Sequence, residues 1–211
     1  MTATGQAAVD KRRVILDAAV RVFARRGFHT CRVSDIADEA GVAYGLVYHY
    51  FSSKDQILDT LFLERWQVLL DVIREVDARE QPARRKLYDI ASFIVDSYRH
   101  DPDLMKVIIA EVTRAANTFG RTHLDVIGEA YDLIADVVRA AQASGEFRLD
   151  VTPDFAALAF YGAIEQVLTG WIFGLLPRGE TEYEQAKDFV VDTICGGLET
   201  APGTGPRRPA L

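Results

Sequence analysis

The residues whose types and spacing predict chemistry are concentrated between positions 28 and 54. Four apolar residues there recur at helical spacing and can seal one face of a short helix: Val33, Ile36, Ala37 and Ala40. Gly41 should end that helix, because glycine reaches the left-handed conformation without steric cost. A second helix is expected over Tyr44–Phe51, with mostly small and aromatic side chains. Two short helices joined by a glycine turn form a helix-turn-helix, whose second helix enters the major groove of DNA.

The residue order around this motif resembles the N-terminal domain of the TetR family of bacterial transcriptional repressors. The matching positions are Gly27-Phe28, Val33, Ile36-Ala37, Ala40-Gly41-Val42, Gly45, Tyr48, Tyr50-Phe51 and Lys54. The resemblance implies an all-α architecture of nine helices, in which a three-helix DNA-binding domain precedes a helical domain for ligand binding and dimerisation. Beyond about residue 55, the chain matches the family only in helix count and length.

The resemblance also implies which side chains meet DNA. Tyr44 and Gly45 open the second helix where family members contact bases, and Gly45 lets the backbone approach closely. Tyr48, His49 and Lys54 occupy positions that resemble phosphate contacts. Tyr50 and Phe51 are expected to pack inside and to lock this helix to the helices over 10–26 and 53–79. For Tyr48, packing in the core is the alternative to a phosphate contact.

The chain departs from the family pattern at three positions, which leaves the operator sequence open. Cys31 stands where Ser or Thr is usual, and a thiol is a poor helix cap and a poor phosphate donor. Thr30 or Arg32 can substitute for it. Ala43 and Leu46 stand where hydroxyl residues are common, and Leu46 can contact a thymine methyl group. The predicted DNA-contacting residues are Thr30, Arg32, Ala43, Tyr44, Gly45, Leu46, Tyr48, His49 and Lys54.

The distribution of charge supports a protein that touches phosphate with one end only. The formal net charge of the 211 residues is −7, which alone argues against DNA binding. Residues 1–54, however, hold eight Lys or Arg and five Asp or Glu, a balance of +3, whereas the remainder holds 16 and 26, a balance of −10. A basic N-terminal segment followed by an acidic remainder, called the body below, fits a protein that contacts phosphate with its N-terminal end.

Helical patterns continue through most of the chain, without a run of alternating strands or an internal repeat. Besides the motif, helices are expected over 10–26, 53–79, 83–100, from 101 onward, and over 121–144, 152–176 and 182–198. Ser53 with Gln56 forms a capping box, and Asp101-Pro102 and Thr152-Pro153 are typical helix starts. Residues 1–9 are expected to be disordered. We therefore predict a DNA-binding domain over 1–54, a ligand-binding and dimerisation domain over 55–200, and a flexible tail over 201–211.

Composition favours a cytoplasmic protein. Cys31 and Cys195 are far apart and show no metal-binding spacing, which suits a reducing compartment. The N-terminus lacks a long apolar stretch, so no signal peptide is expected. Residues 155–176 contain the single charge Glu165 and are long enough to span a bilayer. The alternative, a helix buried between a core and a partner subunit, is favoured because Glu165 and Gln166 lie in its middle and no cluster of basic residues flanks it.

No catalytic, cofactor or metal motif stands out after the helix-turn-helix, so the chain is not expected to be an enzyme. The body is rich in large apolar residues, which ordinary core packing explains for the most part. Some of them can instead line a ligand cavity between helices. The candidates are Phe62, Trp66, Leu69, Phe93, Tyr98, Met105, Ile109, Glu111, Arg114, Tyr131 and Glu165. Glu111 and Arg114 share a helix face, as the polar end of such a cavity or as a surface ion pair.

A narrower resemblance concerns the body. Glu111-Val112-Thr113-Arg114 with Asn117, Ser144-Gly145-Glu146, and Gly162-Ala163-Ile164-Glu165 before Trp171 are similar to the TetR subgroup of fatty-acid-degradation regulators. That resemblance implies a long-chain acyl-CoA effector. The sequence thus predicts a ligand-responsive repressor that binds palindromic operator DNA as a homodimer, through the helices over 152–176 and 182–198. The alternatives are an effector-independent DNA-binding protein and a regulator of a drug-like or aromatic ligand.

Overall fold

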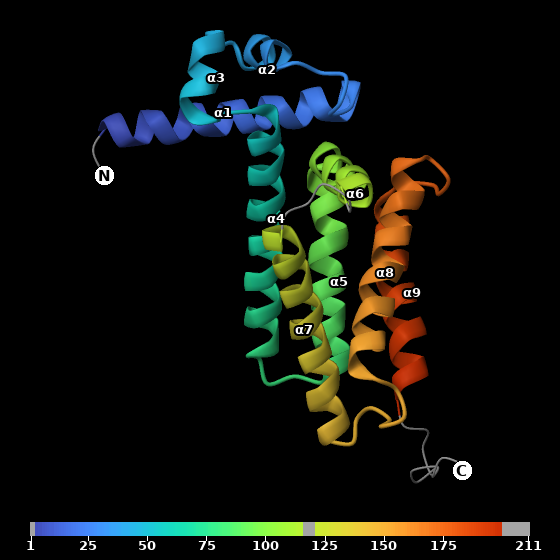
Figure 1. Cartoon of the computed structure of the whole chain (residues 1–211). Coiled ribbons are helices and arrows are strands. Elements are labelled where there is room, and N and C mark those ends of the chain that lie inside the picture. Colours follow the sequence, from blue (N-terminus) through green and yellow to red (C-terminus); the bar gives the residue numbers. More distant parts are fainter. Residues whose placement is uncertain (1–2, 116–120, 200–211) are drawn as a thin grey trace. The chain divides into compact units, whose positions relative to one another are not determined.

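The computed structural model describes residues 3–115 and 121–199, and over these ranges the chain forms nine α-helices (Figure 1). The only extended pairing within them is an isolated bridge between Phe147 and Glu199. The all-α fold predicted from the sequence is confirmed. The helices form two compact units, which are described separately.

The first unit is built around the helix-turn-helix. It contains α1 (Ala3–Arg26), α2 (Val33–Ala40), α3 (Tyr44–Tyr50), α4 (Lys54–Asp77) as far as Arg65, and α6 (Pro102–Ala115). Its core holds fully buried apolar side chains from each of these helices, among them Leu16, Ile36, Val47, Ile57 and Val107. Val107 brings α6 into this core, and the Lys106 ammonium donates to the Ala24 carbonyl of α1 at 2.8 Å. In the structure α6 therefore packs with the helices of the first unit, although the chain places it among the helices of the body.

The turn of the motif follows from Gly41. Its φ of 63° is left-handed, and its N–H donates to the carbonyls of Ala37 and Asp38 at the end of α2. Val42 then donates to Ala37 at 3.0 Å, which fixes the direction of the chain into α3. A side chain at position 41 would be strained in this conformation, since non-glycine residues avoid positive φ.

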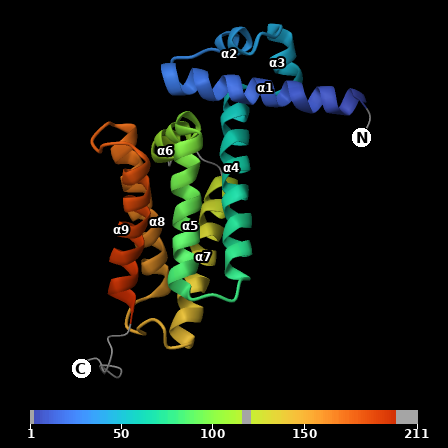
Figure 2. The ribbon, with the colours of Figure 1, turned by 180° about the vertical axis from the view of Figure 1, so that it is seen from behind.

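The second unit contains the α4 residues from Trp66 onward, α5 (Ala83–His100), α7 (Arg121–Ala143), α8 (Pro153–Ile172) and α9 (Glu180–Leu198). α5 packs against α7, α8 and α9, and α8 packs against both α7 and α9 (Figure 2). α5 shows the amphipathic spacing that such a position requires, with Leu87, Ile90, Ala91, Ile94 and Tyr98 buried on one face.

Several helix ends differ from the sequence prediction. α1 begins at Ala3 instead of near residue 10, so the expected disorder over 1–9 is wrong for residues 3–9. α8 ends at Ile172 instead of Leu176, because Gly174 adopts a left-handed φ of 68°. Leu175 can then donate its N–H to the Gly170 carbonyl at 2.8 Å, which closes the helix. α4 ends at Asp77 and α9 begins at Glu180, two residues earlier than expected in each case.

Of the described helices, α8 is the one long and apolar enough to cross a membrane by length and composition. A helix buried in a soluble core passes the same test. α8 packs between α7 and α9 and carries Glu165 and Gln166 near its middle. The predicted tail, residues 201–211, lies outside the described residues.

Candidate functional site

The exposed side of α3 carries two tyrosines that contact each other. Tyr44 is 53% exposed and Tyr48 is 44% exposed, and their rings meet edge to face with centroids 5.1 Å apart. The Tyr44 hydroxyl donates to the Tyr48 hydroxyl at 3.2 Å. Both phenols therefore stand at the surface, where they can meet a base edge or a phosphate oxygen. Core packing, the alternative for Tyr48, does not occur.

The first turn of α3 leaves its backbone uncovered. Ala43 and Gly45 are exposed, Leu46 is half-buried, and Val47 points into the core. A Cβ added at Gly45 would meet no atom of the protein within 4 Å, and its backbone is not left-handed. Nothing inside the protein therefore requires glycine at position 45.

The C-terminal end of α3 combines an exposed and a buried aromatic. His49 is exposed, and its ring lies 5.0 Å from that of the half-buried Tyr50. Phe51 is buried and forms the C-cap of α3. The predicted packing of Tyr50 and Phe51 thus agrees with the structure.

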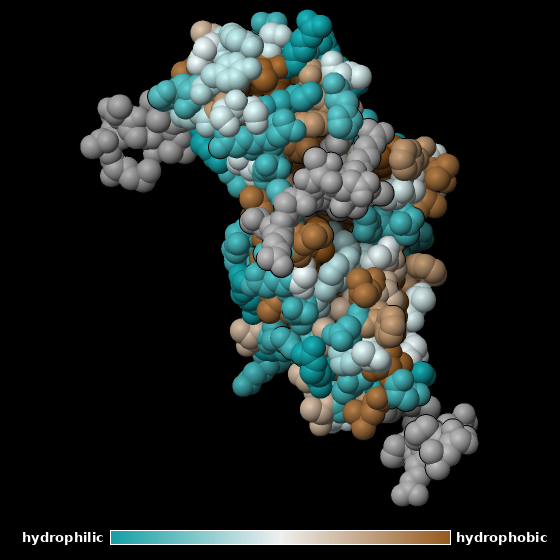
Figure 3. Space-filling model, in the orientation of Figure 1, coloured by the Kyte–Doolittle hydropathy of each residue, from teal (hydrophilic) through white to brown (hydrophobic). Residues whose placement is uncertain are grey.

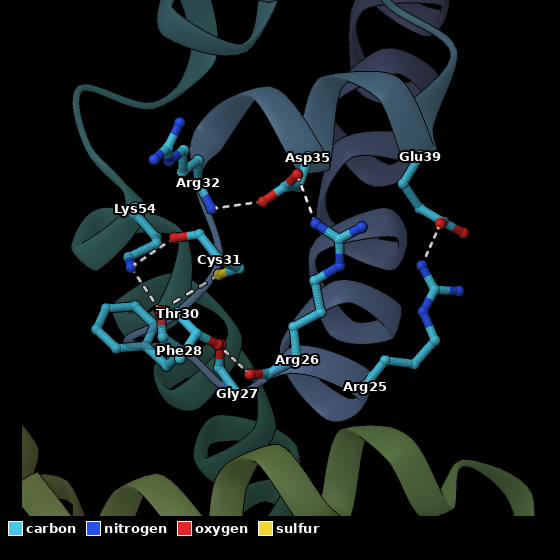
Figure 4. Close-up of polar contacts among 10 residues, drawn as sticks. All are labelled: Arg25, Arg26, Gly27, Phe28, Thr30, Cys31, Arg32, Asp35, Glu39 and Lys54. Atoms are coloured by element: carbon cyan, nitrogen blue, oxygen red, sulfur yellow. Dashed lines mark hydrogen bonds and ion pairs between the residues drawn. The ribbon is translucent and has the colours of Figure 1, made fainter.

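Lys54 holds the loop that precedes α2. Its ammonium donates to the carbonyls of Phe28 and, at 3.0 Å, Cys31, and it lies 4.4 Å from the centroid of the Phe28 ring (Figure 4). An ammonium carries three donors. One donor is therefore left for a phosphate after the two carbonyls are satisfied. Sequence reasoning missed this loop-holding role, because the partners lie more than twenty residues earlier.

Thr30, Cys31 and Asp35 make separate hydrogen bonds between the end of α1 and the start of α2. The Thr30 hydroxyl donates back to the carbonyls of Arg26 and Gly27, so Thr30 caps the end of α1 and not the start of α2. The start of α2 is held by the Asp35 carboxylate, which accepts from the Arg32 N–H at 2.8 Å. Cys31 is buried, and its thiol donates to the Phe28 carbonyl at 3.3 Å. An acidic residue three positions after the N-cap residue was the available sequence signal.

The Arg32 side chain is exposed and points away from the other residues drawn in Figure 4. The hydrogen bond between Asp35 and the Arg32 N–H is the main cause that lowers the pKa of Asp35, and Arg26 lowers it further. Asp35 therefore stays ionised, opposite the Arg26 guanidinium at 2.6 Å. Arg32 is thus held by its backbone while its charge faces outward.

Other arginines of this segment are paired inside the first unit. Glu39 accepts from both Arg25 and Arg21, which together lower the pKa of its carboxylate. Arg12 pairs with Glu64 at 2.7 Å. These pairs tie α2 and α4 to α1, so part of the positive charge counted in the sequence stabilises the unit itself.

The second unit groups three of the predicted ligand-binding residues, Trp66, Tyr131 and Glu165, around Tyr161, which the sequence analysis did not single out. Trp66 of α4 and Tyr131 of α7 each lie 5.5 Å, between ring centroids, from Tyr161 of α8. Glu165 follows Tyr161 by one turn, and its charge raises the pKa of Tyr131 after the larger effect of burial. We name Trp66, Tyr131, Tyr161 and Glu165 the aromatic–acid cluster. Leu69 is buried and Phe93 is half-buried in the same unit.

Tyr98 belongs to a different group of rings. It stacks on Trp171 with centroids 5.4 Å apart, and Tyr183 closes the group from α9. The Trp171 indole N–H donates to the Pro177 carbonyl at 2.9 Å. These contacts fasten the α8–α9 connection, which gives Tyr98 a structural role.

The remaining ligand-binding candidates lie in the first unit. Phe62 and Met105 are buried there, and Ile109 is half-buried. Glu111 and Arg114 lie in α6, but their side chains are outside the described residues, and Asn117 is outside them altogether. In the described part of the chain, no group of His, Cys, Asp or Glu is arranged to hold a metal ion.

A helix-turn-helix with an exposed second helix, followed by a helical second unit, defines a helical DNA-binding regulator. Residues 15–61 match the model described as bacterial regulatory proteins of the tetR family, and residues 62–176 match that of the YsiA-like protein C-terminal region. The fatty acid metabolism regulator protein of Bacillus subtilis (strain 168) is 32% identical over 159 residues, which cover 75% of this chain and 81% of that protein.

Two solved structures are similar over most of the chain. The fatty acid degradation regulator FadR from Bacillus halodurans has a TM-score of 0.78 and 27% identity, covering 89% of this chain and 95% of that one. FadR from Bacillus subtilis in complex with stearoyl-CoA has a TM-score of 0.76 and 25% identity, covering 89% and 99%. The chain belongs to the TetR family of bacterial regulatory proteins, and it is a transcriptional regulator, not an enzyme.

Proposed function

We propose that this protein is a cytoplasmic transcriptional repressor that binds palindromic operator DNA as a homodimer and is released by a long-chain acyl-CoA. The observation that carries the proposal is the similarity, over 89% of the chain, to a FadR that was crystallised with stearoyl-CoA. A regulator of this class joins two events, operator binding and effector binding.

On the DNA side, the proposal uses the exposed surface of α3 and the loop before α2. Tyr44 and Gly45 face the bases, and Leu46 reaches a thymine methyl group. Phosphates are met by the exposed or half-buried polar side chains and by the first turn of α3: Thr30, Arg32, Ala43, Tyr48, His49 and Lys54. In a dimer, the two copies of α3 enter successive major grooves about 34 Å apart.

The proposed dimer forms through α8 and α9. These helices and their connection expose large apolar side chains, including Phe155 at 72% and Phe189 at 67%, together with Leu158, Phe173, Leu175 and Leu176. Figure 3 shows hydrophobic side chains over α8 and at the α8–α9 connection, on the right of the view. Added Cβ atoms at Gly162, Gly196 and Gly197 would meet open space, so a partner backbone can approach there. Exposed apolar surface of this kind marks an interface.

The proposed effector site uses the apolar residues of the body. Each buried methylene contributes about 0.8 kcal/mol, so affinity should rise with acyl chain length until the site is full. Arg114, beside Glu111, is proposed to pair with the phosphate or thioester end, because a guanidinium binds phosphate oxygens in a bidentate manner. α4 contains both Lys54 and Trp66, so its movement is the proposed link between effector and DNA.

The test begins with an operator, obtained by selecting duplexes that the protein retains from a random library. Calorimetric titration with acyl-CoAs of increasing length should then give an affinity that rises and levels off. Effector should weaken operator binding by the same factor by which operator weakens effector binding, as linkage requires. A flat response to chain length would favour a regulator of another ligand. Tight effector binding that is indifferent to operator would refute the induction mechanism.

A further inference from the structure

Glu165 is a half-buried carboxylate beside aromatic rings in the second unit. It lies one helical turn after Tyr161 on α8, so the two side chains share a helix face. Tyr161 contacts the rings of Trp66 and Tyr131, which come from two other helices. Within residues 3–115 and 121–199, no hydrogen bond or ion pair reaches the Glu165 carboxylate, and burial alone raises its pKa.

Asp96, another carboxylate of the second unit, differs from Glu165 because it is paired with a cation. Asp96 of α5 meets the buried Lys187 ammonium at 2.8 Å, and that ammonium also meets Glu184 at 2.7 Å. Charges taken out of water are normally paired in this way, because an unpaired one loses hydration without compensation. Glu165 is half-buried, and no cation from residues 3–115 or 121–199 pairs with its carboxylate. The carboxylate therefore favours a group that enters from outside.

The chemistry of the aromatic–acid cluster defines that group. The faces of tryptophan and tyrosine rings carry negative potential and attract cations. The carboxylate accepts hydrogen bonds and repels a second negative charge, and the repulsion is strong where water is scarce. An uncharged or cationic group is stabilised beside the cluster, whereas a ligand carboxylate placed there would meet both a like charge and the ring faces.

We infer that Glu165 is a specificity-determining residue of the effector site, which admits a lipophilic ligand with an uncharged or cationic group beside the aromatic–acid cluster and rejects a carboxylate there. The inference rests on the proposed function, because it concerns a residue of the proposed effector site. For acyl ligands it means that a thioester is accepted and the free fatty acid is refused. Glu165 acts on the ligand directly, through its carboxylate.

The experiment compares three ligands of equal chain length and different head-group charge. Dodecylammonium, dodecanol and dodecanoate are titrated calorimetrically, below their micelle concentrations, into the full-length protein and two variants. Glu165→Gln removes the charge and keeps the shape. The matched control is Asp132→Asn, which removes an exposed carboxylate next to Tyr131 on α7.

For the parent we expect dodecylammonium to bind at least about tenfold more tightly than dodecanoate, with dodecanol between them. Glu165→Gln should bring the three affinities to within about threefold of one another, and Asp132→Asn should keep the parental order. Dodecanoate that binds the parent as tightly as dodecanol does, or an unchanged spread in Glu165→Gln, would overturn the inference. Should Glu165→Gln fail to fold, the order of affinities in the parent decides alone.

Palmitoyl-CoA titrated in parallel separates this inference from the proposed function. Palmitoyl-CoA binding without any head-group preference would refute the role of Glu165 and leave the acyl-CoA proposal standing. The expected order of head-group affinities without palmitoyl-CoA binding would support the role of Glu165 and refute the acyl-CoA proposal. Binding of none of these ligands would refute both.

Discussion

Gly45 offers a perturbation whose effects on stability and on DNA binding should have opposite signs. It is the second residue of α3, and a Cβ added there meets no atom of the protein within 4 Å. Replacing a helical glycine by alanine removes backbone freedom from the unfolded chain and stabilises by about 0.5–1 kcal/mol. For a chain of this length, Gly45→Ala should therefore raise the melting temperature by about 1–4 °C.

The same methyl group should weaken operator binding. If the backbone of the first turn of α3 touches DNA, the added carbon keeps it from approaching as closely. Loss of one or two hydrogen bonds at about 0.5–1.5 kcal/mol each predicts a reduction in affinity of about tenfold. The measurement is fluorescence anisotropy with a labelled operator duplex at physiological salt, alongside a melting curve of the free protein.

Gly128→Ala is the matched control. Gly128 lies within α7 of the second unit, and its added Cβ also meets open space. It should give a similar rise in melting temperature with unchanged operator affinity. A Gly45→Ala protein that is more stable and binds the operator as well as the parent would show that α3 does not present its first turn to DNA.

Three further outcomes are expected. Arg32→Gln should weaken binding to every duplex and reduce the salt slope by about one without lowering the melting temperature. Lys54→Gln should lower both the DNA affinity and the melting temperature, because Lys54 also holds the loop before α2. Equal melting temperatures of the two variants would contradict this. Phe189→Glu should raise the dimer dissociation constant at least about thirtyfold in sedimentation experiments. The control is Val68→Glu at an exposed residue of α4, which should leave the dimer unchanged. An unchanged dimer in Phe189→Glu would exclude α9 from the interface. Burial raises the pKa of Cys195 to about 11. The free energy of unfolding should therefore be constant below the pKa of the unfolded thiol and fall as pH rises from there toward about 11. A Cys195→Ala protein should lose that part of the alkaline decline, and an identical decline in the variant would refute the role of the Cys195 thiol.

The sequence by itself determined the features that depend on neighbouring residues. The turn at Gly41, the helix starts at Pro102 and Pro153 and the cap at Ser53 were all predicted. The Gln56 N–H donates to the Ser53 hydroxyl at 3.0 Å, which is one half of the predicted capping box, whereas the Gln56 side chain accepts from the Ser52 N–H at 2.5 Å instead of from the Ser53 N–H. Such features are decided within one or two turns of the chain, so their residue types and spacing are sufficient to predict them.

The tertiary structure alone decided which distant residues meet. It joined α6 to the DNA-binding helices through Val107, and it gave Lys54 partners in the loop before α2. It also separated Tyr98, which fastens the α8–α9 connection, from Tyr131, which lies in the aromatic–acid cluster. Both tyrosines have the same apolar helical spacing in the sequence. Periodicity shows that a side chain is buried, but its partners depend on how the helices pack, which residues far apart in the chain decide together.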